Sequence, residues 1–205
     1  MMIADENCRT MKIRLTDRAL PLMYLVLARG VCFQTPPGLP VAGFLADVLP
    51  VSPDYIAGKV QTILMNGHAL DDPEAVLINE PCTLALSAAM PGLFGAAFRR
   101  NGRFSRLRRS YTGGGAAGEK PASGRMVKVR VKLFNQVAGD LGKDLLARGV
   151  CLDIEVLADF WQRQWPLLES GCRDIRIDDT TADPERVAEI LRQQAGTGVL
   201  QATSR

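Results

Sequence analysis

The residues able to carry out acid–base, thiol or metal chemistry are few and far apart. His68 is the one histidine of the chain, and it follows Asn66–Gly67 in a predicted turn. Nucleophilic catalysis needs a serine or cysteine held beside a base, and no such partner stands at a recognisable spacing. Asp71 and Asp72 are typical of a turn or a helix cap. The sequence therefore predicts no catalytic residue and a protein that is not an enzyme.

The cysteines are odd in number and widely spaced: Cys8, Cys32, Cys82, Cys151 and Cys172. No C-x-x-C pair exists, and clustered Cys, His or Asp ligands for a metal are missing. The glycines form neither a dinucleotide-binding G-x-G-x-x-G nor a phosphate-binding loop. We therefore expect no metal and no cofactor, with reduced and mostly buried thiols in a cytoplasmic protein.

The chemically unusual stretch is basic. Six arginines lie within residues 99–109, interleaved with phenylalanine and leucine. Asn101–Gly102 stands between two strand-like runs, which predicts a basic β-hairpin followed by a glycine-rich linker over 112–124. The candidate partner-binding residues are Arg99, Arg100, Arg103, Phe104, Arg106, Arg108 and Arg109.

Three interpretations of this hairpin compete. The arginines grip nucleic-acid phosphates while phenylalanines stack on bases, they pair with an acidic protein partner, or they are a solvated ribbon. Residues 99–125 carry a net charge of +7, so the rest of the chain carries −4 and the total is +3. So small a total charge disfavours a dedicated nucleic-acid binder, and we expect a protein partner.

The segment 91–98, PGLFGAAF, is apolar and uncharged. An exposed patch of this kind would be adhesive. We expect it to pack between the two halves of the chain or to form a contact between copies of the chain in a homo-oligomer.

The elements around these residues repeat. Leu27–Cys32 reads LARGVC, and Leu146–Cys151 has the same six residues. The flanking blocks match in order: KIRL with KVRV near the start of each copy, and DPEAV with DPERV later. We infer two copies of one α/β unit.

Each copy reads as strand, short helix, strand, long helix, strand, turn and strand. The strands are predicted over 11–15, 31–34, 61–65 and 82–87 in the first copy, and over 127–134, 150–154, 174–177 and 199–203 in the second. Apolar residues recur at helical spacing from Val41 to Leu49 and from Leu157 to Leu168. The second stripe includes Trp161 and Trp165, and we expect both tryptophans to be core residues. Gly30 and Gly149 follow a terminal arginine and predict helix ends.

This order resembles that of a β-grasp fold. The stretch Val127–Gly142 resembles the opening of the ubiquitin-like sulfur carriers, the small subunit of molybdopterin synthase and the thiamine-pathway carrier. The stretch Ile63–Ser87 resembles their C-terminal half. The resemblance implies two tandem β-grasp units in an α+β chain, with the first and last strands of each unit side by side in the middle of its sheet.

The resemblance does not carry over the carriers' chemistry. Their function needs a C-terminal diglycine, and this chain ends Gln201–Arg205 without one. Gly113–Gly115 could supply a glycine tail only after proteolysis; a flexible linker is the simpler interpretation.

The predicted domains are 1–92, the hairpin and linker 93–125, and 126–205. No apolar run is long enough to span a bilayer, so we expect no membrane partner. We predict a non-enzymatic protein-interaction or scaffold protein. The alternatives are an RNA-binding accessory module using the hairpin and a degenerate or processed sulfur carrier.

Overall fold

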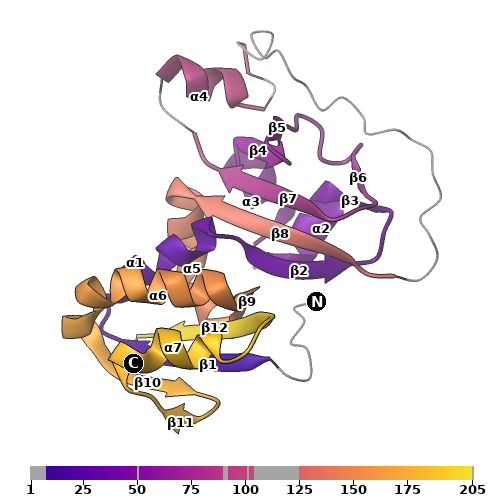
Figure 1. Cartoon of the computed structure of the whole chain (residues 1–205). Coiled ribbons are helices and arrows are strands. Elements are labelled where there is room, and N and C mark those ends of the chain that lie inside the picture. Colours follow the sequence, from indigo (N-terminus) through magenta and orange to yellow (C-terminus); the bar gives the residue numbers. More distant parts are fainter. Residues whose placement is uncertain (1–7, 50, 90–91, 101, 104–124, 205) are drawn as a thin grey trace. The chain divides into compact units, whose positions relative to one another are not determined.

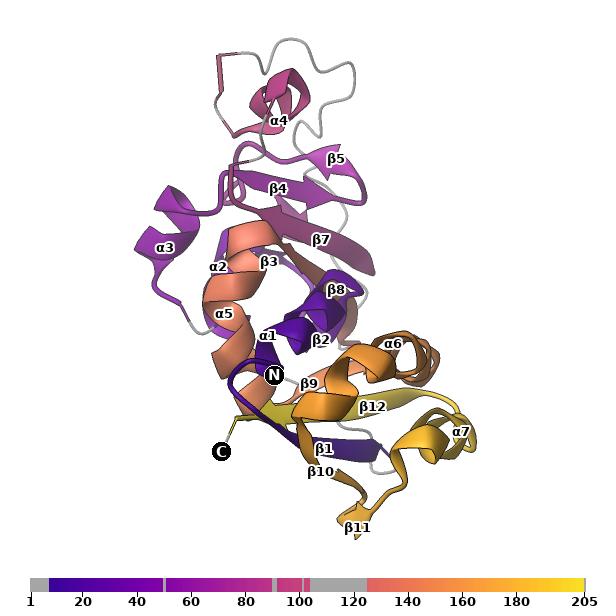
Figure 2. The same ribbon diagram turned by 90° about the vertical axis from the view of Figure 1, so that its left-hand side faces the viewer.

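The computed structural model describes residues 8–49, 51–89, 92–100, 102–103 and 125–204. The architecture is α+β with mixed sheets, as expected (Figure 1, and Figure 2 after a 90° turn). The chain forms two compact units. Among the described residues, those between 33 and 137 form unit 1, and those of 8–32 and 138–204 together form unit 2.

Unit 1 is built on a five-stranded sheet. Its order is β2 (Val31–Thr35), β8 (Val127–Phe134), β7 (Cys82–Ser87), β4 (Thr62–Met65) and β5 (His68–Ala69). A two-stranded sheet joins β3 (Leu39–Pro40) to β6 (Leu77–Ile78), and the helices are α2 (Val41–Val48), α3 (Pro53–Gly58) and α4 (Gly92–Phe98). Phe44 of α2 packs edge-on against Phe33 of β2, with ring centroids 6.1 Å apart. The apolar stripe predicted from Val41 therefore faces the core.

Unit 2 is built on a second five-stranded sheet. Its order is β11 (Thr180–Thr181), β10 (Cys172–Ile177), β1 (Arg9–Leu15), β12 (Thr197–Thr203) and β9 (Val150–Asp153). Its helices are α1 (Leu20–Met23), η1 (Tyr24–Ala28), α6 (Ile154–Leu168), η3 (Glu169–Gly171), η4 (Pro184–Arg186) and α7 (Val187–Arg192). The boundary between the units falls within β2 and within α5 (Asn135–Arg148). Trp161 and Leu157 of α6 are buried with Met11 and Ile13 of β1 in the core.

Each sheet is centred on two parallel strands that come from different halves of the chain. In unit 1, β7 pairs in parallel with β8, from Cys82↔Val129 to Ser87↔Phe134. In unit 2, β1 pairs in parallel with β12, from Arg9↔Gly198 to Arg14↔Thr203. The compact units therefore differ from the predicted domains 1–92 and 126–205, because each half gives a central strand to the other half's sheet.

Two equivalent turns show how the sheets correspond. Asn66–Gly67 joins β4 to β5 with φ angles of 50° and 84°, which confirms the predicted tight turn, and Asp178–Asp179 joins β10 to β11 with 50° and 64°. The Asn66 side-chain oxygen accepts a hydrogen bond from the Thr83 backbone N–H, and the Asn66 backbone N–H donates to the Thr83 carbonyl. Asp178 makes the same reciprocal pair with Thr10. In unit 2, β1 thus occupies the place that β7 has in unit 1.

The strand bounds and the helix ends predicted from the sequence agree closely with the structure. All eight predicted strands are present within two residues at either end. Gly30 and Gly149 follow the helices with φ angles of 111° and 90°, the left-handed conformation that favours glycine at a helix end. The first helix of the first repeat is shorter than expected, since α1 passes into the 3₁₀ turn η1 at Tyr24.

The strand exchange predicts that the two halves of the chain depend on each other. When residues 1–110 and 118–205 are expressed as separate fragments, each lacks one central strand of a sheet and should show little amide protection from hydrogen exchange. Co-expressed, they should copurify as a one-to-one complex with the protection of the intact chain. Independently folded monomeric halves would contradict the exchange.

Candidate interaction surfaces

The arginine predicted at the head of the hairpin has a structural role in unit 1. Arg100 follows α4, and its Nη2 donates to the carbonyls of Ile56 at 2.9 Å and Ala57 at 3.2 Å. These carbonyls belong to the last turn of α3, where a helix leaves its acceptors unpaired and favours a positive charge. The Arg100 backbone N–H also donates to the backbone carbonyl of Gln61 at 2.7 Å. Arg100 therefore caps α3 and fixes the end of α4.

Burial also distinguishes Arg100 from its neighbours. It lowers the pKa of Arg100, and the negative charge of Asp71 opposes this shift. Arg99 and Arg103 are exposed on either side of it. Phe104, Arg106, Arg108 and Arg109 lie outside the described residues. Of the predicted binding residues that the structure describes, Arg99 and Arg103 alone present exposed side chains.

The prediction that a strand precedes Asn101–Gly102 as the first arm of the hairpin is wrong. Residues 92–98 form helix α4 rather than a strand. Leucine and alanine favour a helix, and this stretch has no β-branched residue to favour a strand. Gly95 is buried, and Ala96, Ala97 and Phe98 are half-buried, so part of this apolar segment is already packed. Its role in a homo-oligomer stays a prediction.

A basic row runs along β8 on the outer face of the unit 1 sheet. Val127, Val129, Val131 and Leu133 are at most 6% exposed and face the core. Side chains alternate along a strand, so Lys128, Arg130 and Lys132 point to the opposite face, where they are partly or fully exposed. Thr83 and Ala85 of β7 lie directly opposite Arg130 and Lys132. Phe134 ends the row with 37% exposure.

Sequence reasoning identified this strand but missed the row. The alternation K-x-R-x-K over residues 128–132 could have predicted the row, because alternate residues of a strand lie on the same face. Lys128 and Arg130 also line a small surface pocket of about 220 Å³ with Asn66, Pro81, Cys82 and Thr83.

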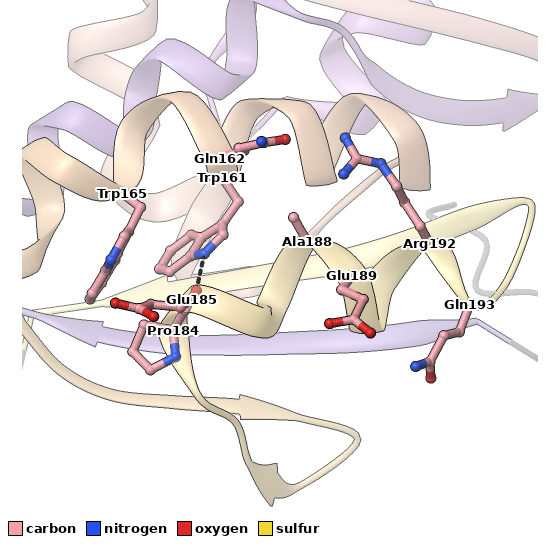
Figure 3. Close-up of a pocket in the computed structure, with 9 residues that line it drawn as sticks. All are labelled: Trp161, Gln162, Trp165, Pro184, Glu185, Ala188, Glu189, Arg192 and Gln193. Atoms are coloured by element: carbon pink, nitrogen blue, oxygen red, sulfur yellow. Dashed lines mark hydrogen bonds between the residues drawn. The ribbon is translucent and has the colours of Figure 1, made fainter.

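A groove between α6 and α7 marks the surface of unit 2 (Figure 3). Its volume is about 560 Å³, and its lining residues are Trp161, Gln162, Trp165, Pro184, Glu185, Ala188, Glu189, Arg192 and Gln193. The sequence predicted both tryptophans to be core residues. Trp161 is a core residue with 1% exposure. Trp165 is only half-buried and forms a wall of the groove.

The thiols of Cys82 and Cys172 are buried and half-buried, and His68 lies at the surface of unit 1. Burial, together with the smaller effect of the Glu80 charge, raises the pKa of the Cys82 thiol to about 11. Burial likewise raises the pKa of Cys172. His68 is exposed on the short strand β5, opposite Met65. Nucleophilic thiols need a lowered pKa, so these two cysteines are poor nucleophiles.

Among the residues that the structure describes, no group of three His, Cys, Asp or Glu side chains lies close enough together to hold a metal ion. No helix among the same residues has the length and apolar character needed to cross a membrane.

Comparison with known proteins gives no assignment: no family model, no curated protein and no solved structure matches this chain.

Capping of α3 predicts a difference between neighbouring arginines. Arg100→Ala removes two charge-assisted hydrogen bonds, a part-buried one to the Ile56 carbonyl and an exposed one to the Ala57 carbonyl. It should lower the free energy of unfolding by roughly 1–3 kcal/mol. Arg103→Ala, the matched exposed control, should change it by less than about 0.5 kcal/mol. Urea unfolding of both variants measures this. Equal stabilities of the two variants would show that Arg100 is not a cap.

The raised pKa of Cys82 predicts slow alkylation. At pH 8 the folded protein holds far less Cys82 thiolate than an unfolded chain with a thiol pKa near 8.5, so iodoacetamide should react about 100-fold more slowly. The rate should climb as the pH rises towards 11. Peptide mapping by mass spectrometry, with urea-unfolded protein as the control, gives both rates. Fast labelling of folded protein at pH 8 would contradict the shift.

Proposed function

We propose that this chain is a non-enzymatic interaction protein and that the outer sheet face of unit 1 binds an acidic segment of a protein partner. The single observation that carries the proposal is the row Lys128, Arg130 and Lys132 on β8. Residues two apart on a strand are about 6.6 Å apart, which matches the spacing of alternate side chains in an extended partner segment. Arg99 and Arg103 add exposed positive charge to the same unit.

The surroundings of the row suit a protein segment. Thr83 and Ala85 are small, so a partner's backbone can approach β7 beside the longer side chains of β8. Complementary charge steers association and selects the partner more than it adds raw affinity. Proteins that bind nucleic acids on a sheet face use several aromatic side chains on which bases stack. Among the residues of β8, Phe134 is the one aromatic.

The sheet order supports a β-grasp ancestry for unit 1. If β8 counts as the first strand, its order is second, first, fifth, third, fourth, with parallel first and fifth strands. The sheet of unit 2 has the same order, but its central strands have exchanged roles. The last strand of the second repeat, β12, lies at the position of β8, and the first strand of the chain, β1, lies at the position of β7. We interpret the chain as two β-grasp units that share strands.

The same comparison disfavours sulfur-carrier chemistry. In a carrier the last strand leads into the glycine tail. Here β7 holds that place in unit 1 and continues to α4, whose end Arg100 fixes to α3. In unit 2 that place is held by β1, which continues into α1.

Binding of simple probes tests the proposal. A fluorescent peptide of alternating glutamate and valine should bind the protein at low salt, and Lys128→Ala/Arg130→Ala/Lys132→Ala should weaken binding roughly ten-fold or more. The matched control Arg18→Ala/Lys59→Ala/Arg173→Ala removes three exposed charges outside the row. It should bind within about two-fold of the parent.

Two results would overturn this function. One is equal weakening by the two triple variants, which would mean binding by net charge alone. The other is tighter binding of mixed-sequence single-stranded RNA than of the peptide, again lost with the β8 row, which would establish the RNA-binding alternative.

A further inference from the structure

The groove between α6 and α7 in unit 2 has a rigid aromatic floor. The Trp161 indole N–H donates to the Pro184 carbonyl at 2.9 Å, which ties α6 to the start of η4. Trp165, one turn further along α6, stacks on Trp161 with ring centroids 5.1 Å apart and an interplanar angle of 27°. Because Trp161 is held in place, the half-buried Trp165 ring is presented to the groove in a fixed position.

Carboxylates surround this floor. Glu185 and Glu189 come from η4 and α7, and Figure 3 shows Glu185 on the side of the groove where Trp165 lies. Both residues are exposed. Glu189 has a weak ion pair with Arg186 at 3.4 Å, in which both side chains remain more than 60% exposed. An exposed pair of this kind contributes little, so Glu189 can exchange its partner.

The arginine at the far end of the groove is already engaged. Arg192 forms ion pairs with Glu155 at 3.3 Å and with Asp159 at 2.5 Å, both on α6. These contacts join the C-terminal end of α7 to α6 and neutralise Arg192. The four carboxylates at and beside the groove outnumber Arg186 and Arg192, so the groove has a net negative charge.

We propose that this groove binds an arginine side chain presented by a basic segment of a partner protein. A guanidinium can stack on an indole face and at the same time pair with a carboxylate through two parallel N–H donors. An ammonium group lacks the planar shape needed for both contacts. Trp165 offers the indole face, and Glu185 offers the carboxylate on the same side.

The groove has a size that suits this ligand. Its volume of about 560 Å³ is within the range of roughly 300–1,000 Å³ that is usual for ligand sites. A long side chain with the backbone on either side of it would fill this space. Ala188 and Pro184 leave an apolar surface for the methylene groups of the arginine stem.

This inference goes beyond the proposed function. It concerns the other unit, a surface of opposite charge and a ligand of opposite charge. The two proposals can therefore fail independently of each other.

Intrinsic fluorescence gives a selective test, because the chain has two tryptophans and both line this groove. The full chain is titrated with the blocked peptide Gly-Arg-Gly-Arg-Gly and with the same peptide carrying citrulline, the neutral analogue of arginine. The arginine peptide should cause a saturable change in tryptophan emission, with an apparent affinity at least five-fold higher than that of the citrulline peptide. The lysine version should bind more weakly than the arginine version.

Variants assign the effect to the groove. Glu185→Gln/Glu189→Gln keeps the shape of both exposed side chains and should weaken the arginine peptide roughly ten-fold. Asp54→Asn/Glu74→Gln, two exposed carboxylates of unit 1, is the matched control and should bind like the parent. The triple variant of the β8 row should also bind the arginine peptide like the parent.

Three outcomes would overturn the inference: no saturable emission change, equal affinity for the arginine and citrulline peptides, or unchanged binding by Glu185→Gln/Glu189→Gln. Melting curves recorded for each variant ensure that only folded protein is compared.

Discussion

The parallel pairing at the centre of each sheet is the interaction on which the rest of the structure depends. β7 and β8 pair over six residues in unit 1, and β1 and β12 do so in unit 2. A central strand forms hydrogen bonds on both edges and buries one face, so a sheet without it would lose the largest part of its order. Because each of these pairs joins the two halves of the chain, folding must close long loops before either sheet is complete.

The exchange also decides which surfaces exist. The row Lys128, Arg130 and Lys132 lies beside Thr83 and Ala85 because β8 pairs with β7. Had β8 paired within its own half, as tandem domains would require, the same cations would lie beside strands of unit 2. The proposed acidic-peptide surface is therefore a product of strand exchange and not of either repeat alone.

The two repeats have diverged where the second surface lies. Asp72 and Asp183 begin equivalent blocks, and each accepts hydrogen bonds from backbone N–H groups two or three residues on. In the first repeat the chain then turns into β6, whereas in the second it continues into η4 and α7. Helix α7 supplies Glu189 and Arg192, so the groove with its stacked tryptophans belongs to unit 2. The two proposed surfaces therefore differ in charge, one basic on unit 1 and one acidic on unit 2.

Arg100 shows that residue type alone does not determine the contacts of a side chain. Six arginines in one stretch suggested a binding surface, and the structure places the second of them under the end of α3 as a cap. The guanidinium suits both roles for the same reason: it carries several donors in a fixed plane. The carbonyls of Ile56 and Ala57 are far away in sequence, and no local pattern shows that they need a donor.

Local sequence patterns predict the strands, the apolar stripes of the long helices and the Asn66–Gly67 turn. These depend on alternation, helical spacing and the backbone freedom of glycine, which act over a few residues. The tertiary structure alone decided which strands are neighbours, that residues 92–98 are a helix, and that Trp165 lines a groove. β1, β7, β8 and β12 all alternate apolar and polar residues and run parallel in pairs, so their local patterns fit either partner. The choice between partners is made by the packing of whole sheets, which no short stretch of sequence records.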